Sequence, residues 1–268
     1  MVNFERKETY SLQDLIEILR ILRAPGGCPW DRAQTHLSDR RNFLEEAYEA
    51  AEAFDRDDPA LMCEELGDVL MQVAFHAQIE AERGRFTMAN VVDGVARKLV
   101  YRHPHVFGDV QADTSQQVLA NWDVLKRREK GQRSTADAVE AVPHTLPALW
   151  RAEKIRSKTA KAGFDWTSSL QALDKLEEEV RELRAALEAG QAADAPHGIR
   201  EELGDTLFMA AKIAQMSGVD PEDALHRACD KFDRRFRAVE EAADKPLPEC
   251  GEAELLALWN DAKSHDPS

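Results

Sequence analysis

Hydrophobic residues recur along this chain at intervals of three and four positions, which is the period of an α-helix with one buried face. Few segments show the alternation expected of a half-buried strand. The clearest apolar stripes are Leu12, Leu15, Ile16, Leu19 and Leu22; Leu66, Val69, Leu70, Val73 and Ala77; and Leu173, Leu176, Val180, Leu183 and Leu187. The pattern predicts an all-α fold.

Boundary signals agree with these stripes. Ser11, with Asp14 three positions later, is a helix start, and Asp220 followed by Pro221 is another, because an acidic cap precedes a proline suited to the first turn. Loops are expected at 26–29, 83–85 and 245–248, where glycine and proline interrupt the period.

The two halves of the chain carry the same four motifs in the same order. Glu-Glu-x-x-Glu begins at Glu45 and again at Glu178, and Glu-x-x-Asp follows at Glu65 and at Glu202. Later come Lys-x-x-x-Arg and Trp-x-x-x-Lys: Lys98, Arg102, Trp122 and Lys126 in the first half, and Lys231, Arg235, Trp259 and Lys263 in the second. We expect two tandem homologous helical-bundle domains, residues 1–130 and 145–268, joined by a linker at 131–144.

The acidic motifs are suited to binding a hard metal ion. Residues three and four apart share a helix face, so the acids of each half converge if its two helices pack antiparallel through their apolar stripes. Their mutual repulsion is costly without cations, and all-oxygen sites suit Mg²⁺ or Mn²⁺. The expected ligands are Glu45, Glu46, Glu49, Glu65 and Asp68 in the first half and Glu178, Glu179, Glu182, Glu202 and Asp205 in the second.

The acidic motifs allow two other interpretations. A glutamate-rich helix is often only a solvated face, but the recurrence of the paired motifs argues against that here. A di-iron bundle normally offers Glu-x-x-His from two helices, and neither acidic box contains it. Redox chemistry is therefore disfavoured.

The basic and aromatic motifs suggest a phosphorylated ligand. Lysine and arginine four positions apart can grip phosphate oxygens, and an indole can stack on a base while a lysine one turn away meets phosphate. The alternatives are a surface ion pair for the first motif and a core tryptophan for the second.

Charge and composition narrow the partners. The formal charge is −15, with 50 acidic against 35 basic residues, which argues against a nucleic-acid-binding surface. No apolar run approaches the roughly 20 residues of a membrane span, and residues 1–10 do not resemble a signal peptide. The 4 cysteines lack disulfide or zinc spacing. We expect a cytoplasmic protein that does not contact membranes.

The chain resembles the MazG family, nucleoside triphosphate pyrophosphohydrolases of the all-α NTP pyrophosphatase superfamily. The resemblance covers almost all of the chain and rests on both acidic boxes together with the segments at 26–31, 102–107, 162–166 and 231–236. It implies a Mg²⁺-dependent homodimeric enzyme that cleaves (deoxy)nucleoside triphosphates to monophosphate and pyrophosphate. It further implies a role in clearing unwanted nucleotides or lowering nucleotide signals under stress.

The resemblance also assigns roles to residues. Glu178, Glu179, Glu182, Glu202 and Asp205 are the implied catalytic and metal-binding set of the second half, which is expected to carry most activity, with Glu178 or Glu179 as general base. Nucleotide contacts fall to Lys231, Arg235, Trp259 and Lys263, and in the first half to Lys98, Arg102, Trp122 and Lys126. Cys229 stands where the family often has asparagine, and Arg200 replaces a lysine before Glu-Glu-Leu-Gly-Asp. An NTP-binding regulatory module that acts through a protein partner is the alternative.

Overall fold

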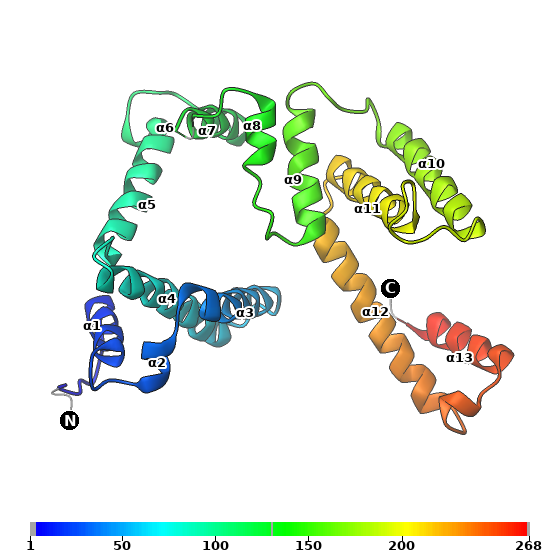
Figure 1. Ribbon diagram of the computed structural model, residues 1–268, viewed down its shortest axis with the longest axis horizontal. Coiled ribbons are helices and arrows are strands. Elements are labelled where there is room, and N and C mark those ends of the chain that lie inside the picture. Colours follow the sequence, from blue (N-terminus) through cyan, green and yellow to red (C-terminus); the bar gives the residue numbers. More distant parts are fainter. Residues whose placement is uncertain (1–3, 130, 267–268) are drawn as a thin grey trace. The chain divides into compact units, whose positions relative to one another are not determined.

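The computed structural model describes residues 4–129 and 131–266. Within these ranges the regular structure is helical and no residue lies in a strand, which confirms the all-α prediction (Figure 1). The chain forms two compact units, Met1–Lys126 and Arg127–Ser268, called unit 1 and unit 2 below. The outer ends of the predicted domains, at 1–3, 130 and 267–268, lie outside the described residues. None of the described helices is both long and apolar enough to cross a membrane.

Unit 1 is built around the pairing of α3 with α4. Its helices are α1 (Leu12–Arg23), α2 (Pro29–Ala33), α3 (His36–Asp55), α4 (Pro59–Glu82), α5 (Met88–Arg102), α6 (Pro104–Phe107) and α7 (Ser115–Glu129). Besides α3, α4 also contacts α1 and α5. The core, which consists of Leu19, Ala74, Phe75 and Ile79, lies between α1 and α4.

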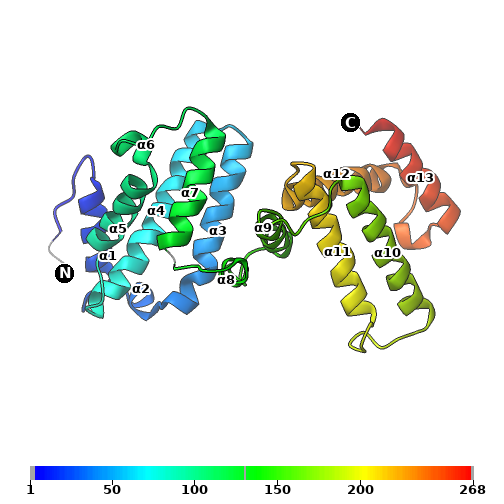
Figure 2. The same ribbon diagram turned by 90° about the horizontal axis from the view of Figure 1, so that it is seen from above.

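Unit 2 repeats this pairing with α10 against α11, as Figure 2 shows. Its helices are α8 (Thr135–Glu140), α9 (Ala148–Ala160), α10 (Ser169–Glu188), α11 (Ile199–Met216), α12 (Pro221–Ala242), the short 3-10 helix η1 (Leu247–Glu249) and α13 (Glu252–His265). The segment expected to be a linker contains α8, which packs on α9. Helix α9 contacts α11 as α1 contacts α4, so the helices around the acidic boxes follow the same order in both units.

Local chemistry at the helix ends matches the boundary signals. The Ser11 side chain accepts a hydrogen bond from the Asp14 amide at 3.3 Å, and Asp14 Oδ2 accepts one from the Ser11 amide at 2.9 Å, which closes a capping box. Asp220 caps α12, with Pro221 in the first turn. The expected loops need small corrections, because Pro29 already begins α2 and η1 occupies part of 245–248.

The apolar stripe on α1 packs in the core as predicted, but the stripes on α4 and α10 are partly exposed. Leu66 and Leu70 on α4 are 50% and 39% exposed, and on α10 Val180 and Leu187 are 44% and 56% exposed. The buried positions of α10 are instead Ala172, Glu179 and Ala186, spaced at seven residues. The paired helices therefore meet through small residues and the acidic face, since small side chains allow close approach, and the leucine stripe faces outward.

Candidate active site

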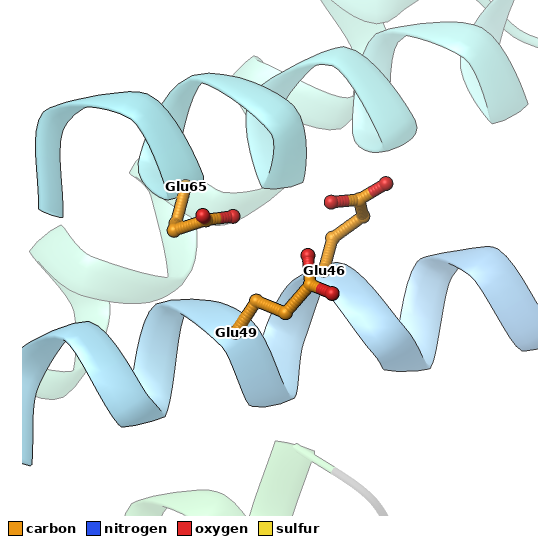
Figure 3. Close-up of side chains that lie close together, drawn as sticks. All are labelled: Glu46, Glu49 and Glu65. Carbon is orange, nitrogen blue, oxygen red and sulfur yellow. The ribbon is translucent and has the colours of Figure 1, made fainter. Parts of the chain in front are cut away.

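Three carboxylates meet where α3 lies against α4 in unit 1. Glu46 and Glu49 come from α3 and Glu65 comes from α4, and the three project into the space between the two helices (Figure 3). One oxygen from each lies within 4.8 Å of the others. The convergence predicted from helical spacing is therefore present, although the leucine stripes do not produce it.

Burial and mutual repulsion weaken the acidity of this cluster. Partial burial, followed by the nearby charge of Asp68, raises the pKa of Glu46 above its ordinary value, and a hydrogen bond with Gln72 only partly opposes this. Loss of solvent, followed by the charge of Glu49, raises the pKa of Glu65. Each raised pKa reflects desolvation first and repulsion between neighbouring carboxylates second, and a bound cation would offset both.

Unit 2 forms the corresponding cluster between α10 and α11. Glu179, Glu202 and Asp205 each offer an oxygen within 4.8 Å of the other two. Glu179 and Glu202 are buried, being 7% and 5% exposed. Burial, followed by the charge of Glu179, raises the pKa of Asp205. In Glu182, desolvation is the largest cause of a raised pKa, to which Glu179 and Glu202 also contribute while Lys175 opposes it.

A lysine that the motif search did not single out lies beside the unit 2 cluster. Lys175 Nζ is 2.8 Å from Glu178 Oε1 and 2.9 Å from Glu179 Oε1. The hydrogen bonds to these two acids raise the pKa of Lys175, and the lysine in turn lowers the pKa of Glu178. In the sequence, Lys175 could have been recognised by its position one helical turn before Glu179. The position with the same spacing in unit 1 is Asn42.

Not every predicted ligand joins a trio. The first glutamate of each box pairs with a cation on its own helix, Glu45 with Arg41 at 2.7 Å and Glu178 with Lys175. Asp68 and Glu182 lie outside the two trios but close to them. The charge of Asp68 contributes to the raised pKa of Glu46, and the charges of Glu179 and Glu202 contribute to that of Glu182. Each unit thus places a fourth carboxylate beside its three.

The predicted nucleotide-binding residues lie on other helices than the carboxylates. In unit 1, Lys98 and Arg102 are on α5 while Trp122 and Lys126 are on α7, and the Arg102 guanidinium lies 5.3 Å from the Trp122 ring. The tryptophan is therefore engaged with a cation rather than sealed in an apolar core.

In unit 2 the equivalent residues lie on α12 and α13, which pack on each other. The Trp259 ring lies 5.3 Å from the ring of Phe232. Arg235 Nε donates to Asp266 Oδ2 at 2.8 Å, while Lys231 and Lys263 are exposed. Arg200, in the first turn of α11, pairs with Asp194.

A buried polar network adjoins the unit 1 cluster and includes acids that were not among the predicted site residues. Asp39 is 3% exposed, and its Oδ1 accepts a hydrogen bond from Asn42 Nδ2 at 2.9 Å. The His36 ring, 2.5 Å from Glu80 and 2.9 Å from His76, lowers the pKa of Glu80 to about 2. The available signal for Asp39 is its position seven residues, or two helical turns, before Glu46.

The donor set of each cluster fits a hard divalent cation. All the converging atoms are carboxylate oxygens, which suit Mg²⁺, Ca²⁺ or Mn²⁺ rather than thiophilic metals. In unit 2 two of the three acids are buried, and buried charges are normally paired or bound to metal. Glu46, Glu49 and Glu65 would hold such an ion in unit 1, and Glu179, Glu202 and Asp205 in unit 2.

The chain is an all-α protein of two repeated units. Each unit brings carboxylates from two paired helices together in a candidate metal site. The family model for the MazG nucleotide pyrophosphohydrolase domain matches the chain twice, at residues 34–107 and 167–239. Each match contains one acidic cluster. The chain belongs to the MazG nucleotide pyrophosphohydrolase family.

Similar proteins extend the match over most of the chain. The nucleoside triphosphate pyrophosphohydrolase/pyrophosphatase MazG of Thermotoga maritima is 40% identical over 95% of this chain and 96% of its own length. The nucleoside triphosphate pyrophosphohydrolase of Escherichia coli is 43% identical over 84% of this chain and 86% of its own. YabN of Bacillus subtilis, an uncharacterized protein, is 43% identical over 92% of this chain but only 50% of its own length.

Proposed function

We propose that this chain hydrolyses (deoxy)nucleoside triphosphates to monophosphate and pyrophosphate with Mg²⁺, or Mn²⁺, as cofactor. The carboxylate trio in each unit is the observation that carries the proposal, because a polyphosphate can approach these acids only if a cation lies between them. The Thermotoga and Escherichia relatives, both named as nucleoside triphosphate pyrophosphohydrolases, support it. The corresponding role is the clearance of unwanted nucleotides or the lowering of nucleotide signals under stress.

Hydrolysis requires water to add to the α-phosphorus while the bond to the oxygen bridging the α- and β-phosphorus breaks, so that pyrophosphate leaves. A bound Mg²⁺ supplies charge that polarises the phosphoryl group and lowers the pKa of water. Lys231 and Arg235 would grip phosphate oxygens, and Trp259 would stack on the base. For Arg235 this requires exchange of its bond to Asp266 for one to phosphate.

The proton of the attacking water needs an acceptor outside the metal ligands. Glu179 belongs to the trio, whereas Glu178 lies beside it and bonds to Lys175. We therefore assign the general base of unit 2 to Glu178. The hydrogen bond from Lys175 lowers the pKa of Glu178, so Glu178 would exchange this bond for one to the attacking water before it accepts the proton.

The reaction is tested by incubating the purified chain with each NTP and dNTP in Mg²⁺ and separating the products by ion exchange. We expect monophosphate and pyrophosphate in equal amounts, and no turnover when EDTA removes the cation. Release of orthophosphate alone would contradict the assignment. Calorimetric binding without product would instead identify a regulatory NTP-binding module that acts through a protein partner.

The exposed apolar stripes support a homodimer. Leu203 and Leu207 on α11 are 45% and 49% exposed, and Val180 and Leu187 extend the same kind of surface on α10. Unit 1 repeats the feature with Leu66 and Leu70. A run of leucines in water is unfavourable by about 25 cal/mol for each Å² of apolar surface, and a second copy offers a matching apolar face.

We expect the chain to behave as a dimer in light scattering coupled to size-exclusion chromatography. Leu207→Glu should shift the mass to that of a monomer, because a charge cannot be buried in the interface without a partner. Leu256→Glu, at a residue on α13 that is 58% exposed and outside the stripes, is the matched control and should leave the mass unchanged. A monomeric unmodified chain would refute the dimer.

The cellular setting follows from the same chemistry. All 4 cysteines are free, as is usual in a reducing compartment, and nucleoside triphosphates are cytoplasmic metabolites. We place the activity in the cytoplasm, with nucleotides rather than nucleic acids or membranes as partners.

A further inference from the structure

Unit 1 contains a cavity that opens beside its carboxylate cluster. Its volume is about 220 Å³, several times the roughly 30 Å³ that a water molecule occupies in the liquid. Buried Leu19 and Phe75 and the exposed ring of Trp30 form part of its apolar wall. Glu46 lines the same cavity and is one of the three converging acids. A ligand whose charged end lies at the cluster can therefore place a flat ring in the cavity.

Two buried hydrogen-bond acceptors in the cavity wall have no hydrogen-bond partner among the residues that the structure describes. They are Oδ2 of Asp39 and Oε1 of Gln72, whose side chains belong to residues only 3% and 4% exposed. His76 Nε2 lies 3.7 Å from Asp39 Oδ2, which is too long for a hydrogen bond. Buried acceptors are almost always satisfied in folded proteins, so both atoms are open to a hydrogen-bond donor that enters the cavity.

Unit 2 does not reproduce these acceptors. With the two acidic boxes in register, Ala172 stands in place of Asp39 and Met209 in place of Gln72. Both replacements are buried, and neither side chain has a carboxylate or amide oxygen that could accept a hydrogen bond. The acceptors are therefore a property of unit 1 and not a requirement of the repeated fold.

The groups around the corresponding part of unit 2 are cationic. Arg156 is 9% exposed, and its guanidinium lies 4.5 Å from the ring of Trp166 and 4.6 Å from that of Phe208. Lys212, at the position of Phe75, is 1% exposed and forms an ion pair with Asp165. Unit 1 has the equivalent cation in Arg23, whose guanidinium lies 5.0 Å from the Phe75 ring, so the two units differ chiefly at Asp39, Gln72 and Phe75 against Ala172, Met209 and Lys212.

We propose that the unit 1 cavity is a base-binding pocket that selects cytosine and adenine, whose exocyclic amino group stands where uracil, hypoxanthine and guanine carry a carbonyl oxygen. The inference rests on the proposed function, because it assumes that the triphosphate lies at the Glu46 cluster. It places the base of unit 1 beside Trp30 instead of against Trp122, the stacking residue that the resemblance implies. The amino group would donate to Asp39 Oδ2 and Gln72 Oε1, since a carboxylate at this position can only accept. Uracil and hypoxanthine present a carbonyl oxygen there, which both acceptors would repel.

Binding to unit 1 can be isolated in the full chain by removing the unit 2 acids with Glu202→Gln and Asp205→Asn. In this background, calorimetry with Mg²⁺ and the α,β-methylene analogues of CTP and UTP compares two bases that differ chiefly in one group. We expect CTP analogue to bind about ten-fold more tightly than UTP analogue, the discrimination typical of a base-specific hydrogen-bonded contact. ATP and ITP analogues should give the same order.

Asp39→Asn keeps the shape of the side chain but adds a donor, so it should reduce the preference for CTP analogue by about ten-fold. Asp93→Asn is the matched control on exposed α5, where Asp93 pairs with Arg97, and should leave the preference intact. If Asp39→Asn fails to fold by circular dichroism, Gln72→Met installs the residue of unit 2 and should weaken the same preference.

The outcomes separate the pocket from the reaction. Equal binding of the CTP and UTP analogues, or a preference that Asp39→Asn and Gln72→Met leave unchanged, overturns the pocket while the hydrolytic function stands. No binding of any analogue in this background removes unit 1 as a nucleotide site, and with it the pocket. Failure of the unmodified chain to release pyrophosphate overturns the proposed function itself.

Discussion

Replacing Glu202 with glutamine and Asp205 with asparagine should lower kcat/KM for triphosphate hydrolysis by about 10²-fold to 10³-fold, a loss of several kcal/mol of transition-state stabilisation. The two changes preserve the shape of the side chains but remove two of the three converging negative charges of unit 2. Cation affinity and phosphate positioning should fail together. The measurement is steady-state release of pyrophosphate at saturating Mg²⁺, and the remaining turnover is that of unit 1.

The matched change in unit 1, Glu65→Gln with Asp68→Asn, should have the smaller effect, because the resemblance to two-repeat family members assigns most activity to the second half. Both double variants should retain the helical circular dichroism of the unmodified chain, since the substituted groups are isosteric. If only the unit 1 change abolishes turnover, the ranking of the two units is wrong. If neither change matters, these carboxylates are not the catalytic ligands.

Without divalent cations, the chain should become more stable as the pH falls from about 7.5 to about 5.5, still above the ordinary glutamate pKa of about 4.3. The pKa values of Glu46, Glu65, Glu182 and Asp205 are raised by desolvation and neighbouring acids. The folded chain therefore binds protons more tightly than the unfolded chain. That contribution to stability is present below the raised pKa values and is lost as the pH rises through them.

Mg²⁺ should replace those protons at the higher pH. A ligand at about 100 times its Kd stabilises a folded protein by about 2.7 kcal/mol, so the thermal midpoint should rise more on adding Mg²⁺ at about pH 7.5 than at about pH 5.5, where protons compete for the same oxygens. Scanning calorimetry with EDTA and with Mg²⁺ measures both effects.

The variant with Glu202→Gln and Asp205→Asn is the control, because other groups also titrate in this window. Burial, for example, lowers the pKa of His76, which favours the folded chain at higher pH and opposes the trend. The difference between the unmodified chain and the variant isolates the unit 2 acids. An equal Mg²⁺ effect in both proteins, or at both pH values, would contradict a metal site at this cluster.

The periodic parts of the molecule could be predicted from the sequence because helices impose a fixed spacing. Glu46 and Glu49 share a face for that reason, and their meeting with Glu65 follows once α3 and α4 pair. The repeat was equally accessible, since order and spacing survive in both halves. What spacing cannot determine is which neighbour covers a stripe, so Leu66 and Val180 were assigned to the wrong contact.

The remaining parts depend on distances between helices, which a linear pattern does not contain. Asp39 and Lys212 lie in helices rich in charge, where solvation is the ordinary expectation, and yet both are buried. Lys231 and Trp259 match a motif, but their placement relative to α10 and α11 depends on how α12 leaves α11. The sequence therefore predicted which acids converge better than it predicted their surroundings.

The tandem arrangement fixes the relative amounts of the two acidic clusters in a cell. Both acidic clusters belong to one polypeptide, so they are always made in a one-to-one ratio, whatever the level of expression. Separate proteins with the same two sites could be adjusted independently. A sequence difference beside one cluster, such as Asp39 in unit 1 against Ala172 in unit 2, therefore gives one molecule two different sites. The amounts of the two sites in the cell remain equal.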